Sequence, residues 1–68
     1  MITHTKPFGI YYWDTFDNET FLISEAGTLK KAIAKVHKRF KGRIKDDGAD
    51  RVDIVDLQGT VVEKFKVG

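Results

Sequence analysis

The hydrophobic period changes twice along this chain of 68 residues, and this change most constrains the fold. In the middle of the chain, apolar residues recur at the helical spacing of about 3.6 residues. They are Leu29, Ala32, Ile33, Val36 and Phe40. On either side, aromatic and β-branched residues form short runs that are typical of strands. The sequence therefore predicts one amphipathic helix between two pairs of strands.

The first strand pair is predicted over residues 8–13 and 20–23. Asp17 and Asn18 lie between them, and both residue types tolerate the left-handed backbone of a tight hairpin turn. A two-residue turn there would pair Tyr12 with Ile23 and Trp13 with Leu22. Alternation then predicts two faces. One carries Phe8, Ile10, Tyr12, Phe21 and Ile23, and the other carries Tyr11, Trp13 and Leu22.

The second strand pair is predicted over residues 51–56 and 60–67, with Gln58 and Gly59 in the turn. This register sets Asp53 opposite Lys64, whereas a three-residue loop would set Asp53 opposite Glu63. Opposite charges across a strand pair are favourable and like charges are not, so we expect the first register. In that register one face is shared by Val52, Ile54, Val61 and Phe65.

The predicted helix has a start signal and a stop signal. Thr28 can act as the N-cap, because its hydroxyl can accept a hydrogen bond from a free amide of the first turn. Gly42 stands where a left-handed C-cap is expected. The helix is therefore expected to end near Lys41.

The simplest assembly of these elements is an α+β domain with two layers. We expect ββαββ order, with a four-stranded, mostly antiparallel sheet and the amphipathic helix packed on one face. Residues 8–68 would form this single domain, and residues 1–7 would form a flexible N-terminal tail. The order of the strands in the sheet does not follow from the sequence.

Charge is distributed very unevenly along the chain. Residues 28–45 contain eight basic side chains and no acidic one, whereas the other residues contain four basic and ten acidic side chains. The net charge of +2 therefore conceals a strongly basic segment in an otherwise acidic chain. On the helix, the basic residues lie opposite or beside the apolar stripe. They are Lys30, Lys31, Lys35, Lys38, Lys41 and the flanking Arg39.

The basic helix face has two interpretations. It can contact a polyanion, because each Lys near a backbone phosphate releases counterions and adds affinity that does not depend on sequence. It can equally be a solvated face that keeps a small protein soluble. Helices usually interleave Glu with Lys, and Lys30 and Lys31 in the first turn oppose the helix dipole. The absence of acidic residues therefore favours a binding role, with a nucleic-acid backbone as the first hypothesis and an acidic protein surface as the alternative.

The sheet face with Tyr11, Trp13 and Leu22 is a second candidate surface. It could contact a protein partner or a second copy of the chain, or stack on nucleic-acid bases. Alternatively, Tyr11 and Trp13 could pack against the N-terminal tail or against each other.

We expect no enzymatic activity and no cofactor. The chain has no cysteine, no Gly-rich phosphate loop and no nucleophile motif, and its histidines, His4 and His37, are isolated. The acidic residues between Asp46 and Asp56 do not have the spacing of a calcium loop, so we also expect no metal site. The sequence is too polar for a membrane span and lacks a secretory leader, so a cytoplasmic location is expected.

Several motifs together resemble a family of small bacterial and phage domains of unknown function. They are an aromatic first hairpin, the helix capped by Thr28 with Ala32 and Ile33, and a final hairpin with Val52, Ile54, Val55, Asp56, Gly59 and Val61. The resemblance covers most of residues 8–67 and implies ββαββ order, but no activity. In fold and size the chain is also similar to small phage-encoded inhibitors of host proteins. If the chain is a protein-interaction module, this likeness suggests a regulator encoded by a phage or mobile element.

Overall fold

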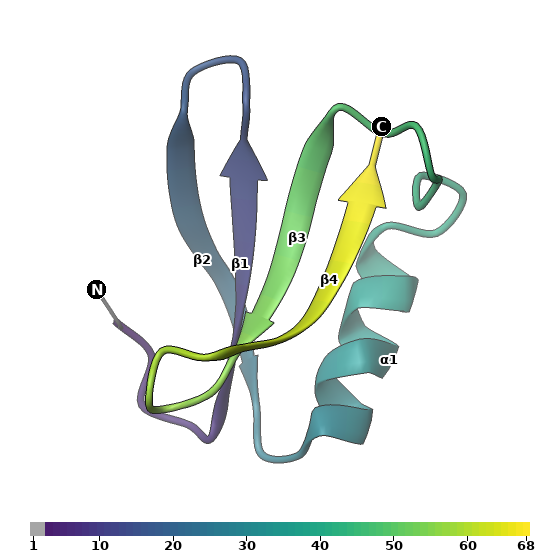
Figure 1. The fold of residues 1–68 in the computed structure, drawn as a ribbon. Helices are drawn as coiled ribbons and strands as arrows, with labels where there is room; N and C mark the ends of the chain where they lie inside the picture. The colour runs from purple at the N-terminus through teal and green to yellow at the C-terminus, as the bar shows by residue number, and fades with distance from the viewer. Residues whose placement is uncertain (1–2) are drawn as a thin grey trace.

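The computed structural model describes residues 3–68, which form one sheet with a helix on one face (Figure 1). The elements are β1 (Phe8–Asp14), β2 (Glu19–Ala26), α1 (Leu29–Arg39), β3 (Asp50–Val55) and β4 (Val61–Val67). The strand order is β2-β1-β3-β4, and each neighbouring pair is antiparallel. The α+β prediction with ββαββ order is therefore confirmed, and the structure supplies the strand order.

This order explains how the single helix covers the sheet. Because β2 and β3 both pair antiparallel with β1, they run in the same direction, and the chain must cross over β1 to connect them. α1 is that crossover. The same order leaves β2 and β4 as the two edge strands.

The core lies between α1 and the middle of the sheet. α1 contributes the fully or nearly fully buried side chains of Ala32 and Val36, and its C-cap residue contributes Phe40. They meet buried aliphatic side chains from the sheet, which are Ile10, Ala26, Val52, Ile54 and Val67. This is a small core, as expected for a chain of this length.

α1 begins where the sequence predicts and ends earlier. The Thr28 hydroxyl accepts a hydrogen bond from the Lys31 amide at 3.1 Å, which confirms the N-cap. The helix ends at Arg39, with Phe40 as the C-cap, so the predicted end near Lys41 is wrong. Gly42 does have a positive φ of 79°, but it lies in the turn beyond the helix. Burial of Phe40 in the core, rather than the position of the glycine, accompanies the end of the helix.

The first hairpin has a longer loop than predicted. Asp14 pairs with Glu19, which leaves residues 15–18 as the loop, and Tyr12 pairs with Phe21 instead of Ile23. Trp13 likewise pairs with Thr20 instead of Leu22. The Asp14 carboxylate accepts hydrogen bonds from the Phe16 and Asp17 amides, and these bonds fold the loop at a point that precedes the expected turn. From Tyr11 to Asp14 the pairing differs from the prediction by two residues, so the predicted faces survive there. A bulge in β2 at Ile23 then reduces the difference to one residue at Ile10.

The second hairpin follows the predicted register over most of its length, with Asp53 opposite Lys64. A β-bulge after Ile54 then sets Val55 opposite Val61. Val61 lines a hollow with Tyr11 and Val55 on the sheet face away from α1, so its predicted place beside Val52 is wrong. The extra residue of a bulge changes the alternation, and the sequence does not mark it.

The N-terminal segment packs on the sheet face opposite α1. His4 is only 5% exposed, and its Nδ1 lies 2.7 Å from the Tyr11 hydroxyl. The amides of Thr5 and Lys6 donate hydrogen bonds to the Glu25 carboxylate. Residues 1 and 2 of the predicted tail lie outside the described residues, but residues 3–6 make specific contacts that the prediction of a loose tail did not include.

Candidate binding surfaces

The six basic residues predicted as a binding surface are all exposed in the structure, and we call them the basic arc. They are Lys30, Lys31, Lys35, Lys38, Arg39 and Lys41. Five lie on α1, and Lys41 lies in the turn that follows it. The Thr28 cap and the buried stripe of α1 fix the orientation of the arc, because the apolar face must point to the sheet.

The charge of this region is not neutralised by neighbouring carboxylates. Among residues 3–68, the only ion pair joins Arg51 and Asp53, which lie on β3. None of the eight basic residues in 28–45 takes part in it. Lys35 does have a partner, because its Nζ donates a hydrogen bond of 2.6 Å to the Glu25 carbonyl. That acceptor carries no formal charge, so the net charge of the region remains.

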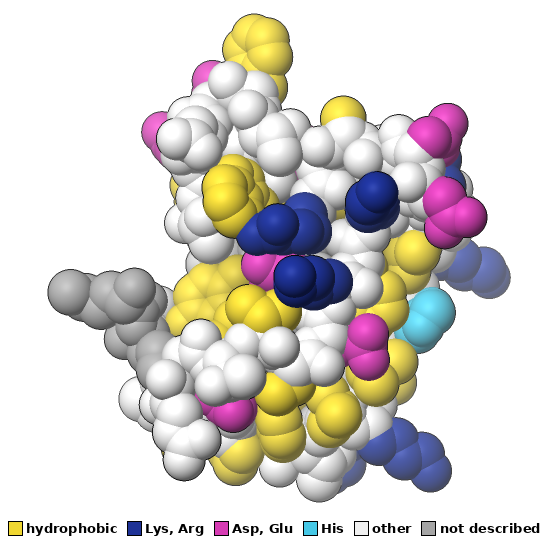
Figure 2. Space-filling view, in the orientation of Figure 1, with side chains coloured by type: hydrophobic (Ala, Val, Ile, Leu, Met, Phe, Trp, Pro, Cys, Tyr) yellow, Lys and Arg dark blue, Asp and Glu magenta, His cyan; other side chains and the backbone are white. Residues whose placement is uncertain are grey.

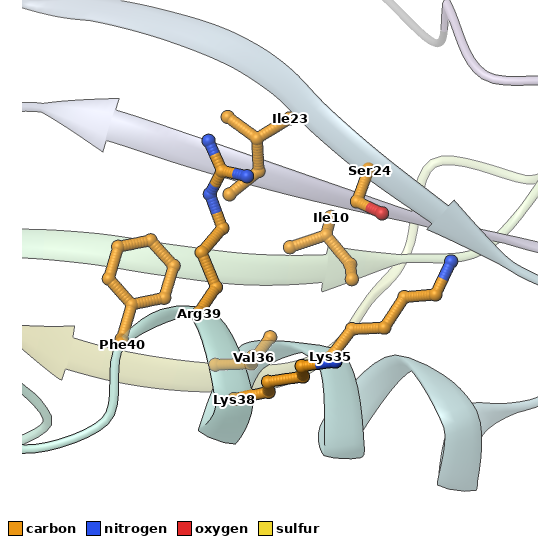
Figure 3. A pocket seen from close by; sticks show the side chains of 8 residues that line it. All are labelled: Ile10, Ile23, Ser24, Lys35, Val36, Lys38, Arg39 and Phe40. Carbon is orange, nitrogen blue, oxygen red and sulfur yellow. The ribbon is translucent and has the colours of Figure 1, made fainter.

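A groove separates the second half of α1 from the edge strand β2, and we call it the β2–α1 groove (Figure 3). Its first part has a volume of about 370 Å³. Ile10, Ile23, Val36 and Phe40 form its apolar surface, and Lys35, Lys38, Arg39 and Ser24 complete the lining. Figure 3 shows Lys35 and Arg39 reaching from α1 toward β2 on either side of Ile10. The groove therefore combines an apolar floor with a cationic rim.

The groove continues toward the first hairpin loop. A second hollow shares Ile23, Arg39 and Phe40 with the first, and its other lining residues are Tyr12, Phe21 and Arg43. The Tyr12 and Phe40 rings are stacked with centroids 5.8 Å apart, and the Arg43 guanidinium lies over the Phe40 ring at 5.4 Å. Phe21 is 46% exposed, although it lies on the side of the sheet that carries α1. Neither part of the groove is lined by an acidic side chain.

A hydrogen-bonded cluster adjoins the groove at Tyr12, which lines its second part. The Tyr12 hydroxyl donates to the Asp50 carboxylate, which also accepts from the Thr15 amide and hydroxyl. The hydrogen bond from Tyr12 is the main reason that the pKa of Asp50 lies below its ordinary value. The same bond raises the pKa of Tyr12, because the phenol donates to a carboxylate in its neutral form. The cluster ties the first hairpin loop to β3.

The predicted aromatic surface is largely engaged within the chain. Tyr11 bonds to His4, which agrees with the alternative in which this face packs against the N-terminal segment. The Arg51 guanidinium covers one face of the Trp13 ring at 4.2 Å from its centroid. Leu22 lies opposite Tyr11 in the β1–β2 ladder and is partly exposed. The three residues are therefore neighbours, but two of them already have partners.

The centre of this outer face carries both basic and acidic side chains. Arg51 pairs with Asp53 at 3.0 Å, so the predicted attraction between Asp53 and Lys64 is not the contact that forms. Lys66 lies opposite Arg51 in the ladder, and Lys64 lies opposite Asp53. Figure 2 shows Lys and Arg side chains gathered around an acidic group on this face, beside a hydrophobic area.

Three residues with clear roles were missed by the sequence reasoning. His4 was assigned to the N-terminal tail, Arg43 was not assigned to either candidate surface, and the exposure of Phe21 was not expected. Gly9 could have indicated the position of His4, because the absence of a side chain at Gly9 leaves the space that the His4 ring fills. The position of β2 at the edge, which the sequence did not reveal, explains the exposure of Phe21.

Residues 3–68 contain no group of three His, Cys, Asp or Glu side chains arranged to hold a metal ion. In the same residues, no helix has the length and apolar character needed to cross a membrane. Comparisons with protein-family models, curated proteins and solved structures found no match to this chain.

Proposed function

We propose that this protein is a small non-enzymatic binding protein whose basic arc contacts a nucleic-acid backbone with little sequence specificity. The observation that carries the proposal is the unopposed charge of residues 28–45, whose eight basic side chains are all exposed. In the described part of the chain none of them forms an ion pair. The proposal includes a cytoplasmic location, where cellular nucleic acid is accessible.

The physical basis is the release of counterions. Each lysine that approaches a phosphate displaces condensed cations, and the affinity gained depends on the salt concentration but not on the base sequence. Lys30 and Lys31 stand at the start of α1 and Lys38 near its end, about 10 to 12 Å apart along the axis at 1.5 Å per residue. This length spans more than one phosphate of a strand. Long flexible side chains on a helix face provide backbone contacts rather than base contacts, which accounts for the expected lack of specificity.

The test is a titration of random-sequence duplex and single-stranded DNA at several salt concentrations. The informative variant is Lys30→Gln/Lys31→Gln/Lys41→Gln, because these side chains belong to the arc and do not line the β2–α1 groove. Loss of three phosphate contacts should lower the slope of log affinity against log salt by about 2 to 3.

The matched control removes the same number of charges elsewhere. Lys6, Lys64 and Lys66 are exposed and lie outside α1, so Lys6→Gln/Lys64→Gln/Lys66→Gln has the same net charge as the arc variant. We expect this control to keep most of the salt slope. Equal slopes for both variants would show that net charge alone attracts DNA, and no binding at low salt would refute the proposal.

The second candidate function is protein interaction, in the form of a regulator or inhibitor that binds an acidic surface of a host protein. The β2–α1 groove favours this candidate, because an apolar floor beside a cationic rim suits a peptide better than a phosphate backbone. The aromatic face supports it less, since Tyr11 and Trp13 are engaged by His4 and Arg51. A homodimer through that face is a weaker alternative for the same reason.

A further inference from the structure

We propose that the open edge of β2 and the β2–α1 groove together form a docking site for an extended acidic peptide segment of a partner protein. The segment would add to the sheet as a fifth strand beside β2. Its apolar side chains would enter the groove, and its acidic side chains would meet the cationic rim. This site shares Lys35, Lys38 and Arg39 with the basic arc, but its proposal does not depend on nucleic-acid binding.

The two edges of the sheet differ in their protection. β4 carries Glu63, Lys64 and Lys66 along its length. Its C-terminal end is covered, because Ile44 bridges to Val67 and the Lys45 amide donates to the Lys66 carbonyl. Charged side chains and covering segments are the usual means by which an edge strand avoids pairing with another chain.

β2 has less of this protection, because its middle carries no charged side chain, although a bulge at Ile23, where the pairing with β1 shifts between Ile10 and Tyr11, interrupts its regular edge. Residues 20–24 contain no charged residue and no proline, and charges occur on β2 only at Glu19 and Glu25. The Lys35 Nζ donates a hydrogen bond to the Glu25 carbonyl, so this carbonyl at the C-terminal end of β2 is not free to pair with an added strand. Between residues 20 and 24, the outward backbone groups have no partner among residues 3–68. This stretch is about 17 Å long and can accept a short strand.

The β2–α1 groove lies next to the position that the side chains of an added strand would occupy. Alternate side chains of an added strand point to the face that carries α1. On that face they would meet Phe21 and Ile23, which are close to the edge, with Phe40 deeper in the groove. The 46% exposure of Phe21 leaves apolar surface that an added strand would cover.

The rim determines the charge of the partner. Lys35, Lys38, Arg39 and Arg43 line the two parts of the groove, and no acidic side chain lines either part. An acidic segment would be attracted and a basic segment repelled. Asp50 is adjacent, but it already accepts hydrogen bonds from Tyr12 and Thr15.

Two other occupants fit less well. Antiparallel pairing of two β2 edges about a two-fold axis would put both helices on one face of the joined sheet and bring their groove cations together. Pairing centred on Leu22 would also set Glu19 of each copy opposite Glu25 of the other, which is unfavourable. A nucleic-acid strand would leave half of the outward backbone groups, the carbonyls, facing phosphate oxygens.

The test uses a synthetic peptide of about ten residues with the repeating sequence Glu-Thr-Phe-Thr, so that Glu and Phe lie on one side of the extended strand. A second peptide has Lys in place of Glu. Binding is measured by fluorescence anisotropy, and backbone amide exchange is followed by NMR. We expect the acidic peptide to bind at least roughly tenfold more tightly than the basic one and to slow exchange of amides within residues 20–24. This comparison uses the unaltered protein, so it does not depend on the stability of a variant.

Variants then separate the rim from the floor. Lys38→Gln/Arg39→Gln should weaken peptide binding several-fold, and Phe21→Ala should weaken it roughly tenfold through loss of an apolar anchor. Lys64→Gln/Lys66→Gln removes two charges from β4 and should leave peptide affinity unchanged. Failure of this peptide test together with a normal DNA titration would reject only the docking site, because the DNA variant leaves the groove lining intact.

Three results would overturn the proposal. The first is equal affinity for the acidic and basic peptides. The second is protection of residues 20–24 that rises with protein concentration in the absence of peptide, which would assign the edge to a second copy of the chain. The third is protection of the same amides by a single-stranded oligonucleotide instead of the acidic peptide, which would assign the groove to nucleic acid.

Discussion

Gly9→Ala should release the N-terminal segment from the sheet. A Cβ at this position would lie 2.5 Å from His4 Cγ, about 1 Å closer than ordinary van der Waals contact. The three nearest heavy atoms all belong to His4, and the backbone of Gly9 does not have a positive φ. The strand itself can therefore accept alanine, and the His4 ring must move.

The size of the effect follows from what His4 loses and what the strand gains. Displacement breaks the hydrogen bond to Tyr11 and exposes a ring that is 5% exposed, at a cost of about 1 kcal/mol for each. Alanine in a strand gains roughly 0.5–1 kcal/mol over glycine, chiefly by restricting the unfolded chain. Gly9→Ala should therefore destabilise the wild-type protein by about 1 kcal/mol.

In a His4→Ala background the same substitution should change sign. With the ring absent, only the strand preference remains, so Gly9→Ala should stabilise by roughly 0.5–1 kcal/mol. Urea unfolding of the four proteins gives the coupling energy, which should be about 2 kcal/mol. Exchange of the Thr5 and Lys6 amides, which bond to Glu25, should become faster in Gly9→Ala. An equal cost of Gly9→Ala in both backgrounds would refute the assignment of the clash to His4.

Other predictions concern the hydrogen-bonded carboxylates, the core and the helix cap. The lowered pKa values of Asp50 and Glu25 mean that both carboxylates contribute stability above the ordinary carboxyl pKa of about 4, and that this contribution is lost as the pH falls through their folded-state values. The urea midpoint should therefore fall between about pH 5 and pH 2, and less steeply in Asp50→Asn; an unchanged pH profile in that variant would contradict the role of Asp50. Phe40→Ala removes a buried ring and should cost about 3–5 kcal/mol, much of the total stability of a domain this small, as circular dichroism would show; a loss below about 1 kcal/mol would disprove this account of the core. Thr28→Ala should cost about 1 kcal/mol and Thr28→Ser much less, and equal losses in thermal unfolding would argue against the cap.

The sequence predicted the elements well because their signals are local. The 3.6-residue spacing of the helix and the Thr28 cap depend only on neighbours within the same segment, and both are confirmed. The first hairpin shows why an incorrect register still gave the correct faces. Because the loop is longer than predicted, Tyr12 pairs with Phe21 instead of Ile23. A shift of two residues leaves each side chain on the same face of the sheet.

The errors arose where distant segments decide the structure. The bulge after Ile54 reversed the side of Val61, and nothing in the local pattern distinguishes that residue from its neighbour. His4 is held by Gly9 and Tyr11, contacts that exist only once the sheet has formed. The β2–α1 groove was not predicted because it depends on the strand order, which leaves β2 at an edge beside the helix.

The two proposed sites share part of their charge, and this sharing has a consequence for binding. Lys35, Lys38 and Arg39 belong to the basic arc and also line the β2–α1 groove. A peptide that neutralises them would remove part of the attraction for phosphates, while Lys30, Lys31 and Lys41 would remain free of the peptide. Nucleic acid and the acidic peptide should therefore compete partially, with each weakening the other by the same factor because the coupling between two ligands is reciprocal. A peptide that left DNA affinity unchanged would place the phosphate contacts entirely on the residues outside the groove.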